Sequence, residues 1–232
     1  MSDSSDPGAG KDRAFVNGLA RGLRVLASFS PEHNRMSLGD LAKATGLPKS
    51  TIARLVHTLV ETGYVYVCPD SGRYSLHPKV LTLGYPVMAS MDKRLVALPM
   101  MQELADYSRG TVSLGIRDGL SMILIERSRD RTVRALPLDI GSRIPMETTS
   151  MGHAYFAAAG TAEQAAILEQ FKTHDPSRFK DVERTLRAAE KEYADKGYCT
   201  AVGIWEDDVN AVGVAVTLSN DVLAAFNCGG PS

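Results

Sequence analysis

The stretch SLGDLAKATGLPKSTIARLVHTLVETGYV, residues 37–65, decides the architecture of the first part of the chain. Ser37 is a suitable N-cap for a short helix, and Gly46 ends that helix where a left-handed backbone conformation costs little. A second helix opens at Pro48 or the next residue and continues through Thr62. Two helices joined by a tight, glycine-containing turn predict a DNA-binding helix-turn-helix.

The exposed positions of the second predicted helix carry basic and hydroxyl side chains: Lys49, Ser50, Thr51, Arg54 and His57. In a helix-turn-helix the start of the second helix enters the major groove. Arg54 is expected to donate two hydrogen bonds to guanine O6 and N7, and Ser50 or Thr51 to contact a phosphate or a base edge. The helix N-terminus itself favours a phosphate. These residues therefore predict a DNA-reading surface.

A β-hairpin wing is predicted directly after this helix. Gly63 breaks the helix, and two β-rich segments, YVYV and YSL, flank a Pro-Asp-Ser-Gly turn. Arg73, at the tip of the hairpin or just past it, is expected to contact the DNA backbone or the minor groove. The alternative is a small helical domain with a hairpin and no nucleic-acid role.

A further helix is expected before the helix-turn-helix, because apolar residues recur there at helical spacing until Ser30-Pro31 stops it. These residues are Phe15, Val16, Leu19, Leu23, Leu26, Ala27 and Phe29.

Composition excludes several other classes of protein. The 232 residues are 44% hydrophobic with a net charge of -1, which excludes a disordered chain, a collagen-like chain and a disulfide scaffold. No apolar run is long enough for a membrane helix, and residues 1–13 lack the apolar stretch of a signal peptide. Three widely spaced cysteines suggest reduced thiols in a cytoplasmic protein. Residues 1–79 have a net charge of +3, and the remaining residues have a net charge of -4. This difference suggests a basic DNA-binding part followed by an acidic part with another role.

The second part is expected to be an α+β domain with a largely antiparallel sheet, because its strand patterns are surrounded by helices without βαβ alternation. A linker helix with Pro86 inside it, where a kink or a division is expected, precedes this domain. The strand segments are expected at residues 111–119, 121–128, 132–141, 198–204, 210–218 and 222–228. The helices are expected at residues 92–109, 150–159, 163–171 and 182–196. The predicted divisions are a flexible tail (1–13), a winged helix-turn-helix (14–77), a linker (78–91) and the second domain (92–232).

The chain resembles the IclR family of bacterial transcriptional regulators across residues 14–232. The runs that carry the resemblance include FVNGLARGLRVLASF, SGRYSLHPKVLTLG, DIGSRIPMETTSMGHAYFAA, KGYCTAVGIWEDDVNAVGVAV and LAAFNCGGPS, besides the helix-turn-helix itself. The resemblance implies a GAF/profilin-like sensor fold for the second domain. It also implies a final helix that this chain lacks. Ala201 and Ala211 occupy positions where some members have polar effector contacts.

No motif for catalysis, nucleotide binding or a structural metal is present, so neither an enzyme nor a cofactor is expected.

A binding site for a small organic acid is instead predicted around Gly141–Gly152 and the late strands. Hydroxyls and the start of a helix would hold the carboxylate, apolar side chains would line the rest, and Asn227 would supply an amide. The candidate residues are Leu136, Met146, Thr148, Thr149, Ser150, Met151, Gly152 and Asn227. The alternative is that the hydroxyls only cap the helix and the methionines only fill the core. Arg143 is expected to hold the loop rather than to bind the ligand.

Taken together, these features predict a cytoplasmic, homodimeric or tetrameric transcription regulator that binds operator DNA and is controlled by a small organic acid, with aromatic acids among the candidates. Two other functions stay open from sequence. One is an enzyme acting on small carboxylic acids with a vestigial winged helix. The other is a winged-helix protein-interaction module.

Overall fold

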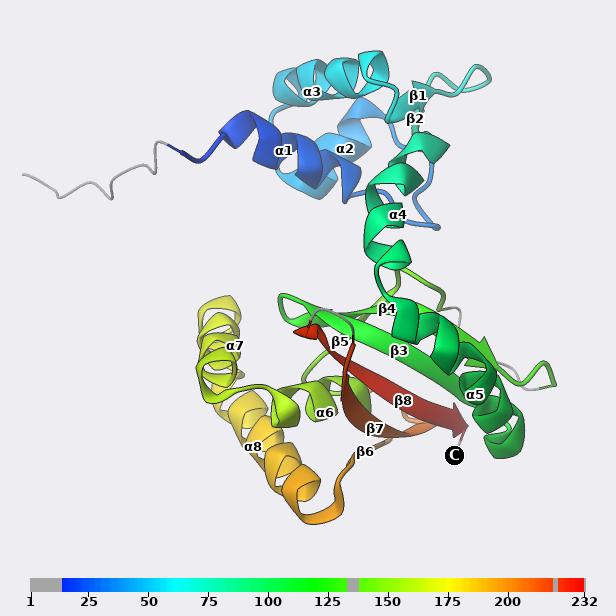
Figure 1. The fold of residues 1–232 in the computed structure, drawn as a ribbon. Helices are drawn as coiled ribbons and strands as arrows, with labels where there is room; N and C mark the ends of the chain where they lie inside the picture. The colour runs from blue at the N-terminus through cyan, green and yellow to red at the C-terminus, as the bar shows by residue number, and fades with distance from the viewer. Residues whose placement is uncertain (1–13, 133–137, 219–220, 232) are drawn as a thin grey trace, which may run out of the picture. The chain divides into compact units, whose positions relative to one another are not determined.

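The computed structural model describes residues 14–132, 138–218 and 221–231, and it divides the chain into two compact units, Met1–Pro86 and Val87–Ser232. The predicted tail, residues 1–13, lies outside the described residues. Figure 1 shows the helices and strands of each unit. Each unit has its own hydrophobic core, and the two are described separately.

From residue 14 to the linker, the first unit consists of three helices and a hairpin: α1 (Asn17–Leu26), α2 (Leu38–Thr45), α3 (Lys49–Glu61), β1 (Val65–Val67) and β2 (Tyr74–Leu76). Its core combines buried side chains of α1, α2, α3, β1 and the loop before α2 with partly buried side chains of β2. Val25, Leu41, Ile52 and Val56 are almost completely buried. The expected apolar face of α1 is only partly correct. Val25 is its buried residue, whereas Leu19 and Leu23 stay exposed, because α2 and α3 cover the side of α1 that carries Val25.

Local signals fix the turn between α2 and α3 as predicted. The Ser37 hydroxyl accepts a hydrogen bond from the Asp40 N–H at the start of α2, and the Asp40 carboxylate accepts one from the Ser37 N–H. This reciprocal capping box satisfies two donors that the helix start would otherwise leave unpaired. Gly46 ends α2 with φ 67°, a left-handed conformation that glycine adopts without steric cost.

The hairpin after α3 is joined to the loop that precedes α2. β1 and β2 pair antiparallel, and Met36 forms a bridge with Tyr74 through two backbone hydrogen bonds of 2.8 and 2.9 Å. The Ser75 hydroxyl also donates to the Asn34 carbonyl. The wing is therefore anchored through β2 by the main chain of the segment that leads into α2.

The predicted linker helix is present, but Pro86 does not divide it. A 3-10 turn (Pro78–Val80) leads directly into α4 (Leu81–Ala89), and Pro86 lies inside α4. The change of helix type therefore occurs at Leu81, five residues before the proline. Of the two alternatives expected at Pro86, the division is wrong and the kink stays a prediction.

The second unit is built on a six-stranded sheet in the order β5-β4-β3-β8-β7-β6, in which every neighbouring pair is antiparallel. The strands are β3 (Thr111–Asp118), β4 (Ser121–Arg129), β5 (Arg143–Pro145), β6 (Cys199–Val202), β7 (Val209–Thr217) and β8 (Leu223–Pro231). The fold class expected from sequence, a winged helix-turn-helix followed by an α+β domain, is confirmed.

Helices cover both faces of this sheet (Figure 1). α5 (Asp92–Ser108) packs with Met101 and Ala105 against the face that carries Leu114 and Ala224. The other face packs against three helices, α6 (Ser150–Ala158), α7 (Thr161–His174) and α8 (Phe179–Lys196). Neighbouring residues of a strand alternate between these two cores, as the period of a strand requires.

Two expectations for the second unit need correction. The strand expected at residues 132–141 lies partly outside the described residues, and 138–141 are not in a strand; the edge strand is Arg143–Pro145 instead. The apolar residues Leu95, Leu98, Met101, Leu104 and Ala105 recur at helical spacing and predict one buried face of α5, but Leu95 and Leu104 are 57% and 44% exposed. α5 carries apolar side chains on more than one face, so its sequence periodicity did not show which face would pack against the sheet.

Within the described parts of the chain, no helix is long and apolar enough to cross a membrane.

Candidate functional site

The outward face of α3 carries the predicted DNA-reading residues. Lys49 and Ser50 form the first turn of the helix, and Arg54 and His57 follow on the same exposed surface, while Thr51 is half-buried. Ile52 and Val56 hold the opposite face in the core of the first unit. α3 is thus fixed to its unit by the side that carries no polar candidates, which leaves the candidates accessible.

The charge distribution of α3 favours an anion at its N-terminus. The first turn contains Lys49 and no acidic residue, and the first N–H groups of any helix lack intrahelical partners. The helix dipole adds a partial positive charge at the same end. A phosphate group placed there would meet no opposing carboxylate from α3, whose acidic residue Glu61 is at its far end.

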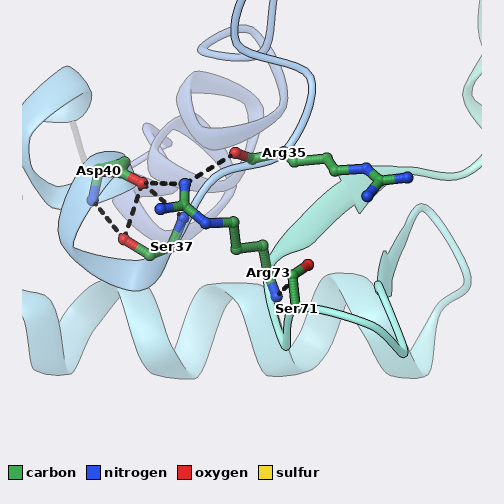
Figure 2. Close-up of polar contacts among 5 residues, drawn as sticks. All are labelled: Arg35, Ser37, Asp40, Ser71 and Arg73. Carbon is green, nitrogen blue, oxygen red and sulfur yellow. Dashed lines mark hydrogen bonds and ion pairs between the residues drawn. The ribbon is translucent and has the colours of Figure 1, made fainter.

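Arg73, the predicted wing contact, lies just past the tip of the hairpin, and its side chain is directed back toward α2 (Figure 2). Its Nη1 atom donates to the Asp40 carboxylate at 3.1 Å and to the Arg35 carbonyl at 3.2 Å. In this arrangement the guanidinium is engaged within the protein, so a phosphate contact by the same Nη1 would have to replace these bonds.

Asp40 is held in place for this contact by the capping box. Hydrogen bonds from the Ser37 N–H and hydroxyl, each 2.9 Å, lower the pKa of the Asp40 carboxyl below its usual value, and Arg73 adds to the lowering. The carboxylate is therefore ionised at neutral pH, as an ion pair with Arg73 requires.

In the second unit, Thr149 forms the N-cap of α6, and its hydroxyl both accepts and donates a hydrogen bond. It accepts a hydrogen bond from the Gly152 N–H at 3.3 Å and donates to the Pro145 carbonyl at 2.6 Å. The sequence left open whether this hydroxyl binds a ligand or only caps the helix. Its contacts in the structure are those of a helix cap. Thr149 still fixes the position of its neighbours Thr148 and Ser150.

Three other candidates carry buried polar atoms without a hydrogen-bond partner in the described part of the chain. These atoms are the Thr148 and Ser150 hydroxyl oxygens and the Asn227 amide oxygen. Buried polar atoms in native proteins are nearly always paired, and each exception needs an explanation. Three of the few such atoms in the described residues belong to the predicted site, although the prediction used only sequence.

The sheet brings Asn227 close to the start of α6. On β8, Asn227 pairs with Ser113 of β3 on one side and with Gly213 of β7 on the other. A Cβ atom at Gly213 would collide with the Ser150 carbonyl oxygen, so the main chain of Ser150 rests directly on β7. Ser150 and Asn227 thus lie above neighbouring strands, and Ser113, which is 5% exposed, is a residue beside them that sequence reasoning missed.

The apolar candidates have structural roles as well. Met146 and Met151 are completely buried in the core between the sheet and the helices. Gly152 has no room for a side chain because the backbone of Met146 lies against it. Leu136 lies outside the described residues.

Small side chains continue this face of the sheet toward β6. Ala201 of β6 pairs with Ala211 of β7, and Ala211 pairs with Gly229 of β8. Ala211 is two residues from Gly213 and therefore projects to the same face. Ala201 and Ala211 thus place methyl groups, and no polar side chain, at these two positions of the strands.

Arg143 holds the loop before α6, as expected. Its guanidinium pairs with the Asp118 carboxylate at 2.5 Å and donates to the Asp118 carbonyl at 3.2 Å. Among the described residues, no group of three or more His, Cys, Asp or Glu side chains is placed to hold a metal ion.

Comparisons with known proteins match both units. Residues 18–67 match the family model described as the IclR helix-turn-helix domain, and residues 86–232 match the model described as the bacterial transcriptional regulator IclR C-terminal. The HTH-type transcriptional regulator TsaQ1/TsaQ2 of Comamonas testosteroni is 30% identical over 221 residues, which cover 94% of this chain and 79% of that protein. These relatives are regulators rather than enzymes.

Solved structures show the same two-part fold. An IclR family transcriptional regulator from Brucella abortus is 39% identical, with a TM-score of 0.82 over 95% of this chain and 84% of that chain. An IclR homologue from Microbacterium hydrocarbonoxydans, solved in complex with 4-hydroxybenzoate, is 23% identical, with a TM-score of 0.72 over 92% of this chain and 89% of that chain.

Proposed function

Because the chain belongs to the IclR family of bacterial transcriptional regulators, we propose that α3 reads operator DNA and that the start of α6 binds a small organic acid. The family membership means DNA binding and regulation of transcription. The residues that perform each task, the class of effector, the oligomeric state and a cytoplasmic location are the proposal.

The DNA-reading proposal rests on the exposed, acid-free first turn of α3. Lys49 and the helix N-terminus offer positive charge to the phosphates, Ser50 and Thr51 offer hydroxyl donors, and His57 extends the surface by one turn. Arg54 lies on the exposed side of α3, about one turn from its start, where a guanidinium can reach a base edge.

A titration of DNA binding tests this assignment. The probe is a fluorescein-labelled duplex selected by the wild-type protein from a random library, and binding is followed by fluorescence anisotropy across salt concentrations. Arg54→Ala should weaken binding about tenfold or more, because it removes a bidentate base contact. Arg21→Ala is the matched control, since Arg21 is an exposed arginine on α1 outside the proposed reading surface.

The outcomes separate this function from a protein-interaction module. Salt-sensitive binding by the wild type that Arg54→Ala weakens more than Arg21→Ala supports DNA reading. Binding that does not depend on salt, or equal losses in both variants, would contradict it.

The effector proposal rests on the three polar atoms around Ser150 that have no partner in the part of the chain that the structure describes. The Thr148 and Ser150 hydroxyls can donate to a carboxylate, and the Asn227 amide oxygen needs a donor such as a ligand hydroxyl. Buried apolar side chains surround this group, as in small-molecule sites. A hydroxylated aromatic acid has both kinds of polar group, and a protein of the same fold binds 4-hydroxybenzoate.

Thermal shift with matched ligands tests the effector class. We expect 4-hydroxybenzoate to raise the Tm of the wild type more than benzoate, which lacks the hydroxyl that would pair with Asn227. Ser150→Ala should reduce the shift for both acids. Loss of the acid during incubation would indicate an enzyme, whereas a shift for neither acid would contradict the proposed class.

We also propose that two or four copies assemble, so that paired winged helix-turn-helix units read half-sites one or more helical turns apart. Exposed apolar side chains at the start of the first unit offer a surface for a second copy: Phe15, Val16, Leu19 and Leu23, which are 54–63% exposed. Effector binding would act on DNA affinity through α4, which joins the two units in the chain. Sedimentation of the wild type and of Leu19→Glu tests the assembly, because a charge on this surface should favour the monomer.

A further inference from the structure

Two ion pairs connect the wing to the segment around the start of α2. In one pair the wing supplies the carboxylate, and in the other it supplies the guanidinium. The Arg35 guanidinium pairs with Asp70 in the turn of the hairpin at 2.8 Å. The Arg73 guanidinium, on the other side of that turn, pairs with Asp40 in the first turn of α2 at 3.1 Å. Each side of the wing tip is thus tied to the helix-turn-helix by one charged contact.

Arg35 takes part in both contacts. Its guanidinium reaches Asp70. Its main-chain carbonyl accepts the second hydrogen bond of Arg73 (Figure 2). The backbone bridge of the next residue, Met36, to Tyr74 holds the end of β2 that is nearest the turn. Main-chain bonds therefore hold β2, and the two ion pairs hold the two sides of the turn.

Asp40 has two functions in this arrangement. One of its carboxylate oxygens accepts from the Ser37 N–H, from the Ser37 hydroxyl and from Arg73. The carboxylate that caps α2 is therefore also the anchor for the wing. α2 packs against α3, so the small core that positions the reading helix also positions the wing.

We propose that Arg73 and Asp40, together with Arg35 and Asp70, are positioning residues that set the place of the wing on the duplex. In this proposal Arg73 increases DNA affinity through the wing rather than by contacting a phosphate. The inference rests on the proposed DNA reading by this unit, and it replaces the phosphate contact expected for Arg73 from sequence.

The size of the expected effect follows from exposure. The four side chains are 47–64% exposed, and exposed ion pairs contribute little stability individually. Breaking one pair should therefore leave the unit folded. DNA binding should weaken only about two- to fivefold, because the free energy lost is that of one exposed ion pair.

Asp40→Asn separates the two roles of Arg73, because the amide oxygen can still cap α2 but no longer holds the guanidinium by charge. If Arg73 positions the wing, the variant should bind the selected duplex about two- to fivefold more weakly. If Arg73 contacts phosphate, removing its internal partner and one negative charge should tighten binding. Glu61→Gln is the matched control, since it removes one exposed carboxylate from the same unit.

Arg73→Gln supplies a readout that a phosphate contact would change. For a positioning residue, the slope of log affinity against log salt should stay that of the wild type, with Arg21→Gln as the control. For a phosphate contact, the slope should fall by about 0.9. The double variant Asp40→Asn with Arg73→Gln should bind no more weakly than the weaker single variant, because both remove the same contact.

A charge exchange tests the second pair without changing net charge. Arg35→Asp and Asp70→Arg should each weaken binding, and the two together should recover most of the loss. Circular dichroism establishes that each variant keeps the helical content of the wild type.

The proposal is overturned if Asp40→Asn binds as tightly as Glu61→Gln or more tightly, if the salt slope falls in Arg73→Gln, or if the charge exchange restores nothing. Failure of the proposed DNA reading would give a different result. The wild type would then show no salt-sensitive DNA binding, or Arg54→Ala would bind DNA as tightly as the wild type.

Discussion

Gly213 of β7 lies directly against the carbonyl oxygen of Ser150, so close that a methyl group at Gly213 would collide with it. The first turn of α6 is thereby pressed onto the sheet beside Asn227, the strand partner of Gly213. This contact places the hydroxyl of Ser150 and the amide of Asn227 in one buried region, although 77 positions separate these residues along the chain. The candidate effector site depends on it.

Gly213→Ala should therefore damage both the stability and the site of the second unit. The added methyl group must move α6 away from β7, which should lower the free energy of unfolding by about 1–3 kcal/mol. Urea unfolding followed through Trp205, the single tryptophan, measures this in the second unit. Val214→Ala is the control, because Val214 lies on the opposite face and is 42% exposed. Equal losses in the two variants would show that the contact with α6 is unimportant.

Thr149→Ala and Ser150→Ala should have opposite effects although the residues are adjacent. Thr149→Ala removes the N-cap and should cost about 1 kcal/mol of stability. Ser150→Ala removes a buried hydroxyl without a partner in the described residues, so stability should be unchanged or higher while binding of the acid falls. Unfolding and ligand titrations of the two variants check this, and a loss of stability in Ser150→Ala would count against an unpaired hydroxyl.

Tyr155 should make the stability of the second unit depend on pH in the alkaline range. Burial, and then the hydrogen bond to Glu163, raise the pKa of Tyr155 to about 12 from an ordinary value of 10.0. The folded state thus retains the phenol proton more firmly than the unfolded state, and this contribution to stability is complete below pH 10. It should decline as the pH rises from 10 toward 12.

Urea unfolding of the wild type and Tyr155→Phe across this pH range measures the effect. The difference in unfolding free energy between them should shrink as the pH rises, because only the wild type loses the contribution of the phenol. A difference that stays constant or grows with pH would rule out the raised pKa.

The three cysteines should differ in reactivity. Cys68 and Cys199 are buried, whereas Cys228 is only partly buried. Burial, and then Glu192, raise the pKa of the Cys199 thiol to about 12, so little thiolate is available at pH 8. With Ellman's reagent the native protein should show one fast thiol, which Cys228→Ser removes. Rapid reaction of all three thiols would mean that the cores open easily.

Local sequence signals predicted the helix-turn-helix well. The N-cap at Ser37, the left-handed Gly46 and the extent of α3 depend on residues within a few positions of one another. The apolar faces of α1 and α5 were harder, because burial depends on which neighbour covers a helix. Val25 rather than Leu23 entered the core of the first unit, and Leu95 and Leu104 of α5 remained exposed.

The candidate sites show the same division. Sequence alone determined the order of elements, the basic face of α3 and the hydroxyl-rich start of α6, because these follow from residue types at short spacing. Only the tertiary structure decided that Arg73 meets Asp40, 33 residues earlier. It also decided that the Ser150 hydroxyl, near Asn227, is buried without a partner among the described residues. The reason is physical: a side chain's partners and its access to water are set by packing between segments distant in the chain, and local periodicity carries no information about that packing.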